Sequence, residues 1–321
     1  MPKPEFIEMD LVAPAKINLW LDVGKRDGSG KHRLSTVMQS VSLCDTMHVQ
    51  ADWDPKHAGI EIETTFGEGI EPEDIPLEKN LVYKALMTFC DYIGKPMGDR
   101  VHIDLVKNVP PQSGLGGGSS DCAAAIKLMA MLYRLDPNGP EAVEVARMLG
   151  SDVAFFIDGG CALLEGYGDI HAARYPSPEL HMVLARPMGG LRTPDVYGKF
   201  DEISADEAPD DPSGTLPEVA RLIGEGAGAA RIAGAVGNGL QTAACELLPG
   251  IVDVLDAFGT LPGVLVSSVT GSGAACYAIC DSCESADRAA DAMIAKGFWS
   301  RACESVSFGA GWEFDADRVT C

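Results

Sequence analysis

The chain reads Val109-Pro110-Pro111-Gln112-Ser113-Gly114-Leu115-Gly116-Gly117-Gly118-Ser119-Ser120-Asp121 between a strand pattern and a helix pattern. Apolar and polar residues alternate over residues 101–105, which is the period of a half-buried strand. Apolar residues recur at helical spacing over residues 123–132, and Ser119 or Ser120 is placed to cap that helix. The sequence therefore predicts a strand, a glycine-rich loop and a helix N-terminus in succession.

A loop of this kind suits a phosphate chain. Glycines let a ligand approach the backbone closely, and a helix N-terminus offers unpaired N–H groups and the positive end of its dipole. The loop matches neither common phosphate motif, because Ser119 takes the place of the P-loop lysine and the Rossmann glycine spacing is absent. The alternative is a flexible turn with a helix cap. The density of glycines between a strand and a helix favours phosphate binding.

Composition limits the classes of function. With 321 residues and 46% hydrophobic residues, the chain is long enough for a sizeable core and suggests two domains. The net charge of −22 argues against general nucleic-acid binding, because a phosphate backbone would be repelled. An anionic small substrate would need a local basic pocket. Basic residues near the candidate sites are Lys16, Arg26, Lys31, Arg33, Lys107 and Arg192.

The chain gives no sign of a membrane or secretory segment. No apolar run approaches the length of a membrane span, and residues 1–5 lack the apolar core of a signal peptide. We therefore expect a cytoplasmic protein without a membrane partner, and expect its ten cysteines to be reduced thiols. Cys276, Cys280 and Cys283 have the spacing of an iron–sulfur motif. Residues four apart on a strand are about 13 Å apart, so a strand at 275–279 argues against such a cluster.

Four polar residues stand at informative places. Lys16 and Asn18 lie on the polar side of an alternating strand pattern over residues 16–23, where an ordinary solvated lysine is the alternative. Asp152 lies at the N-terminus of a short helix, where the helix dipole favours an ionised carboxylate with or without chemistry. Asn80 opens an amphipathic helix, so an N-cap is its simplest role.

The character of the chain changes near Tyr175, where we place a boundary between a domain of residues 1–175 and one of residues 176–321. Residues 201–211 are a run of acids, alanine and proline, most simply a solvated loop. Two apolar strands at 264–269 and 275–279 enclose a second glycine turn, Thr270-Gly271-Ser272-Gly273.

Four segments together resemble one family, the GHMP kinases, which include galactokinase, homoserine kinase and mevalonate kinase. The four segments, in chain order, are Ala13-Pro14-Ala15-Lys16-Ile17-Asn18-Leu19, Gly114 to Ser120, Gly150-Ser151-Asp152-Val153 and Thr270-Gly271-Ser272-Gly273. The resemblance implies an α+β fold with a ribosomal-protein-like N-terminal domain and a ferredoxin-like C-terminal domain. It also implies ATP-dependent phosphoryl transfer to an alcohol, with magnesium bridging the phosphate oxygens.

The resemblance is strongest to the branch of that family whose acceptor is the tertiary 2-hydroxyl of a cytidine-diphosphate-linked methylerythritol. It implies that Asp152 accepts the hydroxyl proton and that Lys16 keeps this carboxylate ionised. The positions implied for the nucleotide are Asn80, Lys107, Pro110, Gly114, Leu115, Gly116, Gly117, Gly118, Ser119 and Ser120. The positions implied for the substrate are Asn18, Lys31, His32, Thr193, Tyr197, Gly271, Ser272 and Gly273. Magnesium has no assigned side-chain ligand; either Ser120 binds it or water and phosphates do so alone.

One departure bears on the substrate. That branch has Asp-Gly-Tyr-His after the first strand, with the tyrosine stacked on the cytosine, whereas this chain has Ser29-Gly30-Lys31-His32. The resemblance leaves Tyr197 as the aromatic on the other face of the base, with Lys31 opposite. His32 and Tyr197 favour the cytidyl substrate, and Lys31 favours a kinase for another alcohol such as mevalonate or homoserine. A catalytically silent paralogue is a third hypothesis. A monomer or weak homodimer is expected.

Overall fold

The structure is a computed structural model that describes residues 6–73, 75–204 and 207–312. The N-terminal residues 1–5 and residues 205–206 of the acidic run lie outside the described residues. Within the described ranges, no helix is both long and apolar enough to cross a membrane.

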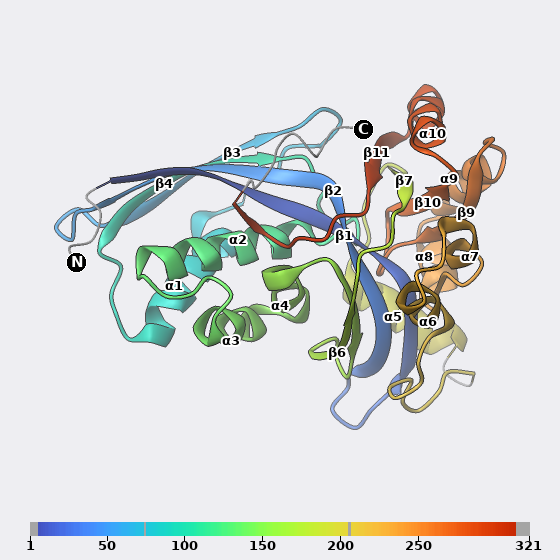
Figure 1. Ribbon diagram of the computed structural model, residues 1–321, viewed down its shortest axis with the longest axis horizontal. Helices are drawn as coiled ribbons and strands as arrows, with labels where there is room; N and C mark the ends of the chain where they lie inside the picture. Colours follow the sequence, from blue (N-terminus) through green and yellow to red (C-terminus); the bar gives the residue numbers. More distant parts are fainter. Residues whose placement is uncertain (1–5, 74, 205–206, 313–321) are drawn as a thin grey trace.

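A long antiparallel hairpin forms the spine of the molecule (Figure 1). It consists of β1 (Phe6–Arg26) and β2 (His32–Trp53), which pair along almost their whole length. The register shifts at three places, between Pro14 and Ala15, between Asn18 and Trp20, and between Val23 and Arg26. Such irregularities increase the local twist of a strand. The same two long strands therefore contribute to two differently twisted parts of one sheet.

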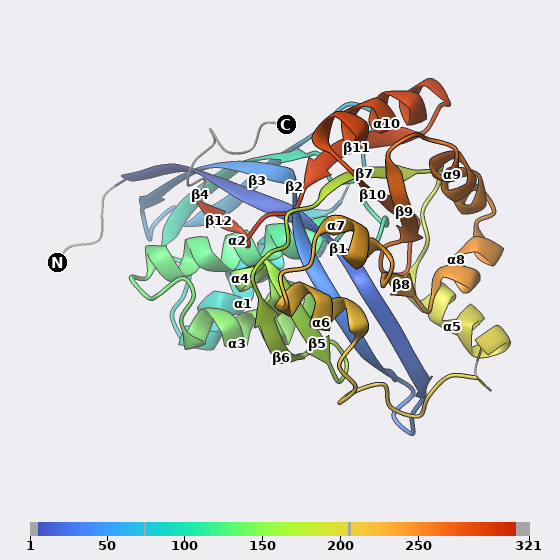
Figure 2. The ribbon, with the colours of Figure 1, turned by 45° about the vertical axis from the view of Figure 1, so that its right-hand side comes forward.

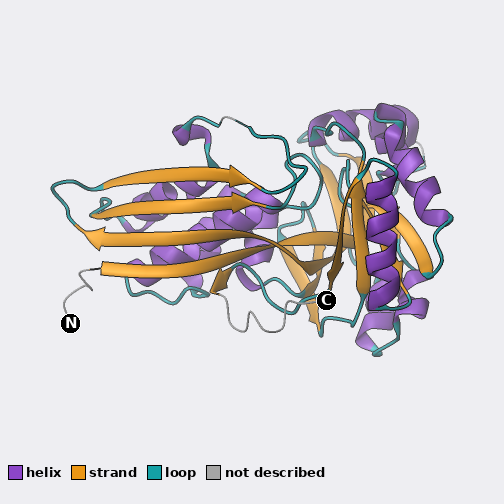
Figure 3. Ribbon diagram, turned by 90° about the horizontal axis from the view of Figure 1, so that it is seen from above, coloured by secondary structure: helices purple, strands orange, loops and turns teal. Residues whose placement is uncertain are grey.

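The first sheet has the strand order β12-β1-β2-β4-β3, with β5 on β2, β6 on β5 and β8 on β1. Its other strands are β3 (Gly59–Phe66), β4 (Asp99–Lys107), β5 (Cys161–Glu165), β6 (Ile170–Tyr175), β8 (Gly237–Asn238) and β12 (Gly311–Trp312). Helices cover one face of its four long strands (Figure 3). They are α1 (Leu81–Ile93), α2 (Gly117–Leu132), α3 (Pro140–Leu149) and α4 (Ser151–Asp158), and the short 3-10 helix η1 (Leu77–Lys79) leads into α1.

The second sheet is antiparallel and has the order β11-β7-β10-β9. Its strands are β7 (His181–Arg186), β9 (Val264–Val269), β10 (Cys276–Cys280) and β11 (Trp299–Glu304). If β7, β9, β10 and β11 are numbered one to four in chain order, their spatial order is 4-1-3-2. This is the order of a ferredoxin-like sheet. The predicted α+β fold with a ferredoxin-like second part is confirmed.

Six helices accompany the second sheet, and α9 and α10 pack on its outer face (Figure 2). The helices are α5 (Thr193–Ser204), α6 (Glu218–Gly224), α7 (Ala229–Ala233), α8 (Gln241–Leu247), α9 (Gly250–Gly259) and α10 (Cys283–Ala295). The other face of this sheet presents Tyr277 and Ile279 to a core shared with Ile17 and Leu19 of β1. The two sheets therefore meet through β1, and the predicted boundary at residue 175 falls between β6 and β7; its exact place stays a prediction.

Two local predictions were wrong. The helix after the glycine loop is capped by Gly116, not by Ser119 or Ser120, because the helix begins at Gly117 and both serines lie inside it. Gly116 has a φ of +77°, a conformation that serine adopts only at a cost. The acidic run is not simply a loop either, because its first residues belong to α5.

The strand predicted at residues 275–279 is present as β10, and within the described residues no group of three or more His, Cys, Asp or Glu side chains could hold a metal ion. Cys276 and Cys280 lie at opposite ends of β10, and Cys283 begins α10. All three thiols are free. Burial raises the pKa of Cys280 to about 11, which disfavours the thiolate that a metal would need.

Candidate active site

The glycine loop joins β4 to α2 and has little room for side chains. A Cβ atom on Gly114, whose φ is +79°, would lie 2.3 Å from the carbonyl oxygen of Thr270. A Cβ atom on Gly116 would lie 2.9 Å from the Phe156 ring and 3.2 Å from the Lys16 side chain. The glycines are therefore needed for packing as well as for any approach of a ligand.

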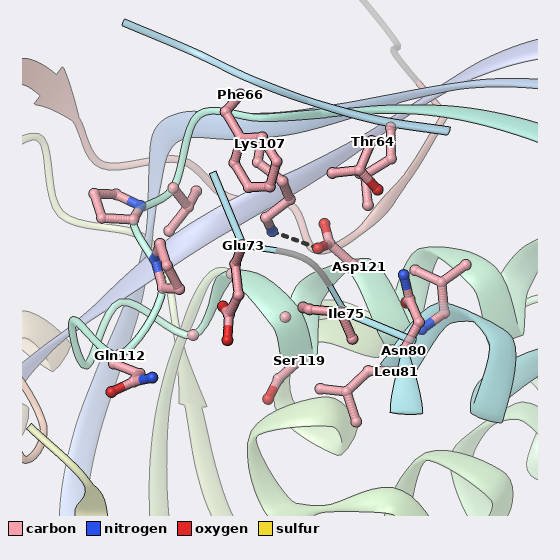
Figure 4. Close-up of a pocket in the computed structure, with 18 of the residues that line it drawn as sticks. Thr64, Phe66, Glu73, Ile75, Asn80, Leu81, Lys107, Gln112, Ser119 and Asp121 are labelled. Atoms are coloured by element: carbon pink, nitrogen blue, oxygen red, sulfur yellow. Dashed lines mark hydrogen bonds and ion pairs between the residues drawn. The ribbon is translucent and has the colours of Figure 1, made fainter. Parts of the chain in front are cut away.

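A cavity of about 620 Å³ opens over this loop. Figure 4 shows Phe66, Lys107 and Thr64 in the upper part of the view, Asp121 and Ile75 near the middle, and Ser119 and Leu81 below. Most of the predicted nucleotide positions line it: Asn80, Lys107, Pro110, Gly114, Gly116, Gly117, Gly118 and Ser119. The side chains of Leu115 and Ser120 are buried and are not part of its lining.

The predicted role of Asn80 as a helix N-cap is confirmed. Its side-chain oxygen accepts a hydrogen bond of 2.9 Å from the N–H of Val82 and so caps α1. The capped helix end lines the cavity wall (Figure 4). A part in nucleotide binding stays a prediction.

A buried ionic cluster lies at the base of the cavity. The Lys107 ammonium donates to Asp121 at the start of α2 and to Asp45 on β2. Asp45 also accepts from the backbone N–H groups of Asn108 and Val109. Burial raises the pKa of Asp121 to about 8, and the charge of Asp45 adds to this effect while Lys107 opposes it. The two carboxylates raise the pKa of Lys107 despite its burial, so the lysine is charged.

The predicted catalytic pair lies where β1, the glycine loop and α4 meet. The Nζ atom of Lys16 is 3.9 Å from a carboxylate oxygen of Asp152 and donates a 2.7 Å hydrogen bond to Asn18 Oδ1. The backbone N–H of Lys16 donates to the carbonyl of Leu115, which ties β1 to the loop. The alternative that Lys16 is an ordinary solvated lysine is wrong, because only 3% of the residue is exposed.

Burial and charge act in opposite directions on this pair. Burial lowers the pKa of Lys16, and the negative charge of Asp152 opposes that shift. Asp152 lies in the first turn of α4, where the helix dipole favours the ionised carboxylate. About a third of its side chain is exposed, so a ligand can reach it.

The second glycine turn closes over the same place. Thr270 Oγ1 accepts from the N–H of Asn18 and donates to Asn18 Oδ1. A Cβ atom on Gly271 would lie 3.2 Å from Lys16 Nζ. The hydroxyls of Ser272 and Thr193 are 3.0 Å apart, so this turn connects to α5. Gly273 instead packs among apolar side chains of the second sheet and α9.

A second cavity, of about 450 Å³, lies at the tip of the β1–β2 hairpin and brings together Lys31, His32, Thr193 and Tyr197. The rings of His32 and Tyr197 are 5.0 Å apart at an angle of 46°. His32 Nδ1 lies 2.9 Å from the carbonyl oxygen of Gly24, and Nε2 lies 3.4 Å from Asp201. Burial raises the pKa of Tyr197 to about 12, and the charge of Asp152 adds to it. The Thr193 hydroxyl in this cavity is 3.0 Å from that of Ser272, so the second glycine turn links the cavity to Lys16.

Comparison with known proteins agrees with this geometry. The model of the GHMP kinases N terminal domain matches residues 80–160, and that of the GHMP kinases C terminal domain matches residues 216–298. The 4-diphosphocytidyl-2-C-methyl-D-erythritol kinase of Mycolicibacterium smegmatis is 34% identical over 85% of this chain and 82% of its own length. The kinase of the same name from Rhodococcus jostii is 33% identical over 97% of this chain and 94% of its own.

This chain belongs to the GHMP kinases, within the 4-diphosphocytidyl-2-C-methyl-D-erythritol kinase group. A crystal structure of a 4-(cytidine 5′-diphospho)-2C-methyl-D-erythritol kinase is 28% identical, covers 92% of this chain and 99% of its own, and superposes with a TM-score of 0.70. A homoserine kinase from Cytophaga hutchinsonii, 21% identical with a TM-score of 0.65 over 96% of this chain and 97% of its own, shows the same fold. The protein is a small-molecule kinase that uses ATP as a substrate.

In this GHMP kinase, several residues that shape the site were missed by sequence reasoning. They are Thr36, Asp45, Asp121, Tyr167 and Asn238. Thr36 accepts a hydrogen bond from the Asn18 amide, and Asn238 donates to the carbonyls of Val269 and Gly271. Only Asp121 left a trace in the sequence, because it is the one acid in α2, a helix of mostly small and apolar residues, and a buried acid needs a partner.

Proposed function

We propose that this GHMP kinase transfers the γ-phosphoryl group of ATP to the tertiary 2-hydroxyl of 4-diphosphocytidyl-2-C-methyl-D-erythritol. The observation that carries the proposal is the position of the Lys16–Asp152 pair between two cavities. Lys16 contacts the glycine loop beneath the larger cavity. It also borders the turn of Gly271 and Ser272, and the Ser272 hydroxyl lies 3.0 Å from that of Thr193 in the smaller cavity. A donor nucleotide in the first and an alcohol in the second would meet at this pair.

In the proposed reaction, Asp152 accepts the proton of the 2-hydroxyl while the hydroxyl oxygen attacks the γ-phosphorus and ADP leaves. The ammonium of Lys16 keeps Asp152 ionised and stabilises negative charge on the attacking oxygen. Asn18 holds the ammonium in place through its 2.7 Å hydrogen bond. Gly271 and Ser272 close the site from the second half of the chain.

The larger cavity fits a nucleotide. Its glycine loop and the N-terminus of α2 present N–H groups to phosphates, and its apolar side chains suit a purine ring. The described residues contain no cluster of His, Cys, Asp or Glu that would hold a resident metal ion. We propose that magnesium would arrive with ATP as the Mg-ATP complex and would need no resident ligand set in the protein. When bound, it neutralises phosphate charge.

The smaller cavity would take the cytidine. Tyr197 offers a ring face already packed on His32, and Lys31 and Arg26 bring positive charge for a diphosphate. Local positive charge is required because the chain as a whole carries −22. The cytoplasmic location and the monomeric or weakly dimeric state stay predictions.

The test is ADP release measured in a coupled assay with Mg-ATP and one acceptor at a time: the cytidyl substrate, mevalonate or homoserine. We expect turnover with the cytidyl substrate alone and its loss in Asp152→Asn. Turnover with mevalonate or homoserine instead would keep the phosphoryl-transfer chemistry and overturn the proposed acceptor. No turnover of any acceptor by a folded protein would favour the silent paralogue.

A further inference from the structure

The smaller cavity contains a second tyrosine that the hairpin sequence does not supply. Tyr167 lies in the turn between β5 and β6 and lines the cavity together with Tyr197, Lys31 and His32. We propose that Tyr167 is the second aromatic wall for the base and so a residue that determines specificity for the cytidyl substrate. This inference rests on the proposed function.

Tyr167 is fixed in place before any ligand binds. Its hydroxyl donates to the carboxylate of Asp27 in the hairpin turn, and its own N–H donates to Asp169 at 2.9 Å. The flanking glycines at 166 and 168 both have positive φ, which gives the turn its sharp shape. A ring held at its hydroxyl and at its backbone loses little freedom when a base stacks on it.

The turn and the hairpin tip form one structural unit. Leu34 donates its backbone N–H to the carbonyl of Gly166 at 2.8 Å. Asp27, which accepts from Tyr167, also accepts from the N–H and the hydroxyl of Ser29. Hydrogen bonds from Ser29 and Tyr167 lower the pKa of Asp27, so the acceptor is ionised. Tyr167 is therefore tied by hydrogen bonds to the segment that carries Lys31 and His32.

The face of the Tyr167 ring already attracts cations. Lys31 Nζ lies 5.5 Å from the ring centroid, and the Arg33 guanidinium carbon lies 5.6 Å from it. Lys31 lines the cavity and is exposed, so its long side chain can leave the ring and meet a phosphate when a base takes its place. The Lys31 position thus needs no aromatic residue, because the aromatic surface comes from another part of the chain.

The experiment compares Tyr167→Leu, Tyr167→Phe and wild type, with Tyr92→Leu as the control for loss of an exposed tyrosine that lines neither cavity. We expect Tyr167→Leu to raise KM for the cytidyl substrate about tenfold and to weaken binding of cytidine 5′-diphosphate in calorimetry to a similar degree. KM for ATP and kcat should stay within twofold. Tyr167→Phe keeps the ring and should stay within about threefold of wild type.

A rescue distinguishes stacking from mere support of the fold. Lys31→Tyr in the Tyr167→Leu background should restore KM to within threefold of wild type, which a purely structural role of Tyr167 would not allow. A KM and a cytidine diphosphate affinity unchanged in Tyr167→Leu would overturn the inference and leave the proposed function standing. A wild-type enzyme that neither turns over the cytidyl substrate nor binds cytidine diphosphate would overturn both.

Discussion

The ammonium of Lys16 lies 3.9 Å from the carboxylate of Asp152, although the two residues are 136 positions apart. This distance is too long for a strong hydrogen bond and short enough for charge stabilisation. Asn18, not Asp152, is the nearest acceptor of the ammonium in the described structure, at 2.7 Å. The carboxylate therefore keeps free lone pairs for a substrate hydroxyl, which is what a general base needs.

Replacing Asp152 by Asn should lower kcat by about 10²–10⁴-fold, the range expected for removal of a general base. The KM for ATP and the KM for the cytidyl substrate should each change by less than fivefold, because the amide keeps the shape of the side chain. Steady-state ADP release measures both parameters, and circular dichroism checks the fold. A kcat within tenfold of wild type would rule out Asp152 as the base.

Asn18→Ala should lower kcat about tenfold, because it frees the Lys16 ammonium from its hydrogen-bonded position. Thr36→Val is the matched control, since it removes the acceptor of the Asn18 amide and leaves the Lys16 bond intact. Both variants should lose about 1–3 kcal/mol of unfolding free energy in urea. Equal losses of kcat in the two variants would mean that Asn18 acts only through stability.

The KM for ATP should rise as the pH increases through about 8. The raised pKa of Asp121 means that the folded protein holds this proton at neutral pH and loses it near pH 8, which adds a negative charge beneath the phosphates. Asp121→Asn should flatten the pH profile of KM, because the amide does not titrate. An unchanged profile in this variant would show that another group causes the rise.

Lys127→Met should stabilise the protein. Burial lowers the pKa of Lys127 to about 8, and Asp158 and Asp136 offset this only in part. Between pH 8 and the ordinary value of 10.5 the unfolded chain binds the proton that the folded one lacks, so stability rises with pH there.

At or below pH 8 the folded state bears the full cost of burying the charged Lys127 ammonium. The Lys127→Met variant should therefore gain about 1–3 kcal/mol of unfolding free energy, measured in urea at pH 7. The gain should shrink toward pH 10. Exposed Lys84→Met is the control, with an expected change within about 0.5 kcal/mol. A loss of stability in Lys127→Met would mean that its ammonium is better paired than its surroundings indicate.

Gly114→Ala should cost at least about 1–3 kcal/mol of unfolding free energy and raise KM for ATP, because its Cβ would meet the Thr270 carbonyl at a positive φ. Gly259→Ala in α9 is the matched control, since nothing lies within 4 Å of its added Cβ. That control should be neutral or slightly stabilising. Thermal unfolding and ATP titration together decide whether the loop tolerates a side chain.

The local features were predictable from the sequence and the long-range ones were not. Glycine density and hydrophobic period are local, so the glycine loop, its strand and its helix could be predicted. Asp45 faces Lys107 only because β2 and β4 pair with Thr46 opposite Val106. Strand register depends on tertiary packing, which a single sequence does not reveal.

The aromatic wall shows the same limit. Comparison of the hairpin with its family pattern finds Lys31 where an aromatic residue is expected, and correctly places His32 and Tyr197 in one cavity. Tyr167 follows in another segment, and it reaches the hairpin through the pairing of β5 with β2. The sequence could show that an aromatic was absent from the hairpin, but the fold was needed to find another in the same cavity.

The pairing of β12 with β1 affects how the protein emerges from a ribosome. Leu11 and Val12 of β1 pair with Trp312 and Gly311 of β12, which are synthesised about 300 residues later. At about 5–20 residues per second, the upper edge of β1 stays uncovered for about 15–60 s. An unpaired strand edge is a template for association between nascent chains. This stretch of β1 therefore stays open to such association until β12 has been made.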